Sequence, residues 1–144
     1  MTIMHWFPPS PSEGPRSIVD LHPEDFSMEC KINGMRILVF PDGSIFTRHG
    51  TPVTKHKGMH LIRRATAGLP ITIDAEWEFR SGIAVLHVFD LPDLDGDYDA
   101  RVAEIPAVIR AVGPLSDDGV SVQPIPRATG PFREHFEAWR AAGF

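Results

Sequence analysis

Lys31 is the residue of this sequence whose setting best suits nucleophilic chemistry. It stands in the stretch MECKINGMR, between the apolar residues Cys30 and Ile32 and directly before an Asn33-Gly34 pair. An ordinary lysine amine has a pKa of about 10.4, so a nucleophilic lysine needs burial, a cationic neighbour or a metal to lower that value. Asn-Gly favours a tight hairpin turn. Two interpretations follow: a solvated lysine beside a turn, or the nucleophile of an enzyme.

Short runs with strand character surround Lys31. Three of them are separated by Asn33-Gly34 and Asp42-Gly43, which predicts a meander of three antiparallel strands at residues 27–32, 36–41 and 44–50. In this arrangement the Asn-Gly turn would hold Lys31 at the end of a strand. A helix is expected between Thr54 and Gly68, because apolar residues recur at helical spacing and a glycine commonly closes a helix.

The second half of the chain alternates strands with helices. Strands are expected at residues 70–80, 83–91 and 119–126. The second of these is apolar on both faces, as an interior strand would be, and the prolines of the third suit an outer strand. Helices are expected at 102–112, beginning late or kinked because of Pro106, and at 130–143. The predicted class is α+β, with antiparallel and mixed sheets flanked by helices.

The composition is that of an ordinary globular protein. The chain has 144 residues, of which 42% are hydrophobic and 23% charged, and a formal charge of −5. Its single cysteine excludes an internal disulfide and a cysteine-based zinc cluster. No apolar run has the length of a membrane span and the start lacks signal-peptide regions, so we expect no membrane partner and a cytoplasmic protein. Residues 1–26, rich in Pro and Ser, are expected to form an extended arm.

Four segments match the motifs of one enzyme family in the family's order. ECKINGMR resembles a Lys-x-Asp-Gly motif followed two residues later by Arg, with Asn33 in place of Asp, and FTRHG resembles a Ser/Thr-Arg-x-Gly motif. IDAEWEF resembles Leu-Asp-Gly-Glu with Ala75 in place of Gly, and VLHVFDL resembles a Phe-Asp-Leu strand. These motifs are those of the covalent nucleotidyltransferases: ATP-dependent DNA ligases, RNA ligases and mRNA capping enzymes. The resemblance is specific over residues 29–91.

This resemblance implies a reaction centred on Lys31. The lysine would attack the α-phosphate of ATP in the presence of Mg²⁺ and form a lysyl-AMP adduct. The AMP would then pass to the 5′-phosphate of nicked DNA or RNA, and the strand would be sealed with release of AMP. Glu29, Ile32 and Asn33 would belong to the nucleotide site beside Lys31, with Glu29 at the adenine edge and Asn33 orienting the lysine loop.

Four further residues receive roles from the same resemblance. Arg36 and Arg48 would bind ribose or phosphate oxygens, because a planar and always charged guanidinium suits anions. Glu76 would bind the ribose or a divalent metal, and Phe89 would stack on adenine. Each residue also has an ordinary structural explanation: surface charges for the arginines, a solvent-facing strand carboxylate for Glu76 and a core aromatic for Phe89.

Residues 27–144 resemble only part of a ligase adenylation domain, without an oligonucleotide-binding domain. In the family, a Glu-Gly-Val-Val strand and a Lys-x-Lys strand follow the position at which this sequence stops. We therefore expect a second polypeptide to complete the enzyme, or self-association through an open sheet edge, and we expect inefficient adenylation by the isolated chain. Two alternatives stay open: a non-catalytic nucleotide-binding or protein-interaction module on a ligase-like fold, and a GTP-using guanylyltransferase of the capping type.

Overall fold

A computed structural model describes residues 27–55, 58–80, 82–112 and 120–143. The described residues divide into two compact units, one within residues 33–124 and the other formed by residues 27–32 together with 125–143. The expected extended arm at 1–26 lies outside the described residues. Within the described part of the chain, no helix is long and apolar enough to cross a membrane.

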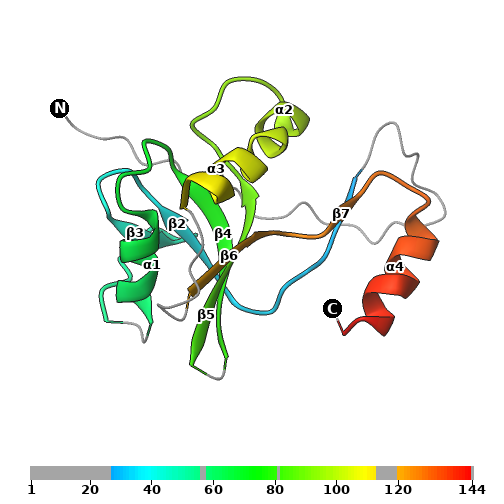
Figure 1. The fold of residues 1–144 in the computed structure, drawn as a ribbon, viewed down its shortest axis with the longest axis horizontal. Coiled ribbons are helices and arrows are strands. Elements are labelled where there is room, and N and C mark those ends of the chain that lie inside the picture. Colours follow the sequence, from blue (N-terminus) through cyan, green and yellow to red (C-terminus); the bar gives the residue numbers. More distant parts are fainter. Residues whose placement is uncertain (1–26, 56–57, 81, 113–119, 144) are drawn as a thin grey trace. The chain divides into compact units, whose positions relative to one another are not determined.

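A five-stranded sheet forms the framework of the larger unit (Figure 1). In spatial order its strands are β3 (Ile45–Thr47), β2 (Met35–Val39), β4 (Ile73–Arg80), β5 (Ile83–Asp90) and β6 (Val120–Pro124). All neighbours are antiparallel except β5 and β6, which run parallel. The outer position of β6 confirms the edge strand predicted from its prolines.

One face of this sheet carries the hydrophobic core. Side chains alternate across the pleat, so Ile37, Ala75, Trp77, Leu86 and Val88 all point to the same side and are buried there. Helices α1 (Met59–Thr66) and α3 (Ile105–Val112) cover this face and contribute to the same cluster. The opposite face carries polar side chains in alternate positions, and these supply the candidate functional site.

Two short helices replace the single helix predicted around Pro106. The first, α2 (Tyr98–Ala103), ends at Glu104, and α3 begins at Ile105. Pro106 is thus in the first turn of α3, where its missing N–H removes no helical hydrogen bond. The expected disturbance of this helix by Pro106 therefore takes the form of a break at Glu104. Both helices lie in the connection from β5 to β6, as a parallel pair of strands requires a crossover.

The smaller unit contains two short strands and a helix. Strand β1 (Met28–Glu29) pairs antiparallel with β7 (Arg127–Ala128), and the Cys30 N–H donates to the Pro126 carbonyl at 3.0 Å. Helix α4 (Phe132–Ala141) starts after Pro131, as predicted. The helices, the antiparallel two-stranded sheet and the mixed five-stranded sheet together confirm the α+β class.

The predicted hairpin across Asn33-Gly34 is wrong. The strand before this pair is joined to β7, and β2 is joined to β3 and β4, so the three-stranded meander reduces to the β2–β3 hairpin. The turn type favoured by Asn-Gly needs a positive φ at both central residues, and Gly34 does not have one. Gly34 is required for another reason: a Cβ there would lie 2.3 Å from the Trp77 carbonyl oxygen.

This close approach predicts a stability defect in Gly34→Ala. The added methyl group would push the start of β2 away from β4, and we expect a loss of about 1–3 kcal/mol in the free energy of unfolding. Urea denaturation followed by circular dichroism measures this loss. A variant within about 0.5 kcal/mol of the unmodified chain, as is usual for neutral surface changes, would contradict the close-packing explanation.

Candidate functional site

A row of polar residues crosses the face of the five-stranded sheet that lies opposite the hydrophobic core. The strand registers place Arg36 opposite Glu76, Glu76 opposite His87, and His87 opposite Gln123. We call these four residues the polar row. Two of the predicted site residues, Arg36 and Glu76, are therefore level with each other on neighbouring strands.

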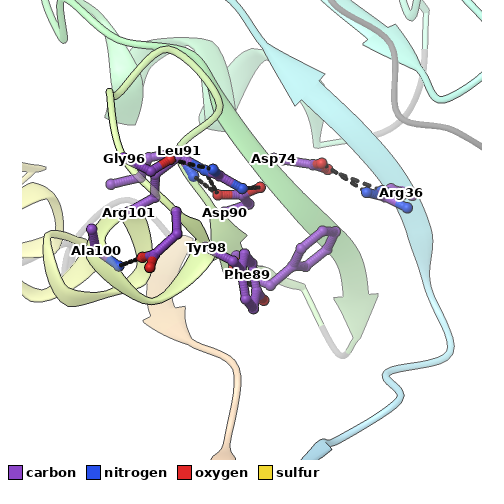
Figure 2. Close-up of polar contacts among 10 residues, drawn as sticks. Arg36, Asp74, Phe89, Asp90, Leu91, Gly96, Tyr98, Ala100 and Arg101 are labelled. Atoms are coloured by element: carbon purple, nitrogen blue, oxygen red, sulfur yellow. Dashed lines mark hydrogen bonds and ion pairs between the residues drawn. The ribbon is translucent and has the colours of Figure 1, made fainter. Parts of the chain in front are cut away.

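Arg36 is held by a buried carboxylate on the next strand. Its Nε donates to Asp74 Oδ1 at 3.0 Å and its Nη2 donates to Asp74 Oδ2 at 2.8 Å (Figure 2). The Asp74 side chain has no exposed surface, whereas 26% of the Arg36 side chain is exposed. Burial raises the pKa of the Asp74 carboxyl, and the hydrogen bonds and charge of Arg36 oppose that effect. A bidentate ion pair of this kind fixes the guanidinium in one orientation.

Phe89 lies against the same guanidinium. The Arg36 Cζ is 4.8 Å from the centre of the Phe89 ring, a cation–π contact. The register between β4 and β5 shifts beside Phe89, since Asp74 pairs with Asp90 while Ala75 pairs with Val88. This bulge re-aims the side chains at the end of β5, a common device next to functional sites. Arg36, Asp74 and Phe89 thus form one packed cluster on three strands.

The segment after β5 is fixed by a second ion pair. Asp90 accepts two hydrogen bonds from Arg101, at 2.9 and 3.1 Å, and the Tyr98 hydroxyl donates to the Phe89 carbonyl at 3.1 Å (Figure 2). Asp97 caps α2 by accepting from the Ala100 N–H. These contacts hold the backbone of Phe89 from the α2 side, so the ring position does not depend on the strand alone.

Glu76 uses one carboxylate oxygen to hold the chain that leads to Lys31. The Gly34 N–H donates to Glu76 Oε1 at 3.0 Å. Gly34 directly precedes β2. Its N–H is therefore bonded to a side-chain carboxylate of β4, where a residue within the ladder would bond to a backbone carbonyl. Within the residues that the structure describes, no group of three or more His, Cys, Asp or Glu side chains is arranged to hold a metal ion.

His87 occupies the third position of the polar row. It is buried, its Nε2 is 3.4 Å from Glu78 Oε2, and its Nδ1 is 3.3 Å from Gln123 Nε2. Sequence reasoning did not single out His87. The signal available was its place in an apolar strand, opposite a carboxylate in the next one.

Lys31 belongs to the smaller unit, beside a cavity. The lysine is exposed and lies two residues after β1. Of the two apolar residues that flank it, Cys30 is buried and Ile32 is partly exposed. A cavity of about 390 Å³ is lined by Met28, Glu29, Cys30, Lys31, Phe136, Trp139 and Arg140. Glu29 also faces Arg127, at 3.9 Å. Glu29 and Lys31 are thus brought together at one cavity.

Asn33 and Arg48 complete the predicted set. Asn33 is exposed, and it is the first residue of the larger unit. Arg48 lies in the turn that follows β3, and its Nε donates to His49 at 3.2 Å. The structure therefore gathers the predicted residues into two groups, one around Arg36 and Glu76 in the larger unit and one around Lys31 in the smaller unit.

Comparison with known proteins gives structural likeness without sequence matches. No family model matches the sequence, and no curated protein matches it. A solved structure described as "DNA binding with a minimal scaffold: Structure-function analysis of Lig E DNA ligases" is similar with a TM-score of 0.59 and 17% identity, over 87% of this chain and 54% of that chain. The chain has a DNA-ligase-like fold.

A second solved structure supports the same fold. It is described as Pmar-Lig_PreS3 and is similar with a TM-score of 0.58 and 17% identity, over 82% of this chain. The present chain covers 36% of that one and 54% of the first, so it spans between a third and about half the length of these ligase-like structures.

The buried ion pair predicts a large effect of Arg36→Met. Removing the guanidinium would leave the Asp74 carboxylate buried without a partner, and we expect a loss of about 3–5 kcal/mol in the free energy of unfolding. Urea denaturation measures the loss. The matched control is the double variant Arg36→Met with Asp74→Leu, which removes both charges and should recover most of the stability. Equal stability of the two variants would contradict this account of Asp74.

Proposed function

We propose that this chain is an adenylation-domain subunit or fragment of an ATP-dependent polynucleotide ligase, with DNA as the favoured substrate. The observation that carries the proposal is the cluster of Arg36, Glu76 and Phe89 on one face of a DNA-ligase-like fold. Glu76 holds the chain at Gly34, three residues after Lys31.

In the proposed reaction, the unprotonated Lys31 Nζ attacks the α-phosphorus of ATP. An N–P bond forms, the bond to the β-phosphate oxygen breaks, pyrophosphate leaves, and the amine proton passes to solvent or a base. The AMP then moves from Lys31 to a 5′-phosphate at a nick. The neighbouring 3′-hydroxyl attacks that phosphate, so the strand is sealed and AMP is released.

Several described side chains suit the groups of ATP. Phe89 offers an aromatic ring, Arg36 and Arg48 offer guanidinium donors for anionic oxygens, and Glu29 lies beside Lys31 at the cavity. Mg²⁺, when bound, would neutralise charge on the phosphates. The sequence resemblance assigns Glu76 to this ion or to the ribose, whereas Glu76 Oε1 accepts from the Gly34 N–H.

The partner proposed for the chain is a second polypeptide that supplies the remaining catalytic groups. The described residues of the smaller unit form one sheet of two short strands, and isolated two-stranded sheets are marginal in water. This observation also favours a second candidate function, a non-catalytic module that binds a nucleotide or another protein. Phe136, with 51% of its surface exposed beside the cavity, is the feature that such a protein partner would cover.

Labelling with α-³²P-ATP and Mg²⁺ tests the proposed nucleophile. We expect a small labelled fraction in the isolated full-length chain, located at Lys31 by peptide mass spectrometry, and no label in Lys31→Arg. Arginine keeps the positive charge but its guanidinium is not a nucleophile at neutral pH. GTP in place of ATP is expected to give less label.

The outcomes separate the candidates. Retention of ATP in equilibrium dialysis without any label on Lys31 would support the non-catalytic module. Absence of both binding and label would contradict a nucleotide function. Stoichiometric labelling would support the lysine nucleophile and contradict the need for a second polypeptide.

A further inference from the structure

We propose that Glu76 is a positioning residue for the Lys31 loop and acts through its hydrogen bond to Gly34. This inference rests on the proposed function for its catalytic consequence, but its structural part stands on contacts alone. The Gly34 N–H donates to Glu76 Oε1 at 3.0 Å, and an added Cβ at Gly34 would meet the Trp77 carbonyl oxygen at 2.3 Å and Glu76 Cγ at 3.1 Å. Gly34 is therefore held on β4 by a charged acceptor and by close packing.

We call this attachment of Gly34 to Glu76 and Trp77 the clamp, and its location in the chain gives it a function. The chain passes from the smaller unit to the larger unit between Ile32 and Asn33, one residue before Gly34 and one residue after Lys31. The regular ladder between β2 and β4 begins at Met35, opposite Trp77. The Glu76 carboxylate extends the attachment of the chain to β4 by one residue, up to the edge of the crossing. It fixes the backbone at Gly34, three residues after Lys31 in the chain.

Glu76 is also set in place by its neighbours. It is partly buried, its own backbone lies opposite Arg36 on one side and His87 on the other, and both flanking residues Ala75 and Trp77 are buried in the core. A strand residue with such fixed neighbours is a rigid support for a loop. The sequence resemblance gives Glu76 a ribose or metal contact, whereas the geometry points to the loop as the partner of at least one carboxylate oxygen.

Two conservative substitutions separate positioning from charge or metal binding. Glu76→Gln keeps an acceptor oxygen at the same reach and removes the charge. Glu76→Asp keeps the charge and shortens the side chain by one methylene. A positioning role predicts that Gln preserves Lys31 labelling better than Asp does, with an unchanged Mg²⁺ concentration for half-maximal labelling. A metal or charge role predicts the reverse order, and a higher Mg²⁺ requirement in Glu76→Gln.

Amide hydrogen exchange at Gly34, measured by NMR on the full-length chain, decides the structural part independently of activity. We expect exchange to rise about tenfold or more in Glu76→Asp and Glu76→Ala, and by much less in Glu76→Gln, because a hydrogen bond to a charged or amide acceptor is lost in the first two only. Glu78→Gln is the matched control. It changes a carboxylate on the same strand and face that lies by His87, and should leave Gly34 exchange unchanged.

The two proposals fail in different ways. Unchanged Gly34 exchange in both Glu76→Asp and Glu76→Ala overturns the positioning role, whether or not the lysine is labelled. Better labelling in Asp than in Gln also overturns it. Absence of Lys31 label in the unmodified chain, together with altered exchange in the variants, supports the clamp and counts against the proposed ligase function.

Discussion

A carboxylate buried without exposed surface is the constraint on which the polar face of this protein depends. Asp74 lies in the central strand of the sheet, and the two hydrogen bonds from Arg36 provide its compensating charge. A buried charge without a partner is strongly destabilising, so β2 and β4 must keep their register for the pair to form. That register also brings Glu76 level with Arg36 and places Gly34 against Trp77. The pairing of Arg36 with Asp74 and the positions of Glu76 and Gly34 thus depend on the same register between β2 and β4.

The same interaction bears on how a nucleotide would be recognised. The guanidinium of Arg36 gives its Nε and Nη2 to Asp74 and one face to Phe89, so it is oriented before any ligand arrives. Such preorganisation lowers the entropic cost of binding. The Tyr98 hydroxyl donates to the Phe89 carbonyl, and Arg101 donates to Asp90. Two ion pairs and one aromatic ring therefore form a rigid face, next to the point at which the chain crosses toward Lys31.

Sequence patterns predicted the elements well and their pairing less well. Apolar patterns and glycine positions located β4, β5, β6, α1 and α4, because burial follows the period of each element. The Asn33-Gly34 signal misled, because it reports local turn preference, and here the glycine is needed for close approach to Trp77. The pairing of Asp74 with Arg36 and of Asp90 with Arg101 depends on strand register and a bulge, which no local pattern encodes. For the candidate site, motifs selected Arg36, Glu76 and Phe89, which do share one face, but did not reveal that these residues bind protein groups.

The central proposal is that one ATP molecule is bound by the residues that the ligase resemblance assigns to it, Lys31 and the Arg36 cluster among them. Two-dimensional ¹H–¹⁵N NMR spectra of this 16.0 kDa chain, recorded during titration with ATP and Mg²⁺, test it directly. The account predicts saturable shifts in the amides of Lys31, Gly34, Arg36 and Phe89 together, with one common dissociation constant. Shifts confined to residues away from both groups, or different constants for Lys31 and the Arg36 cluster, would contradict it.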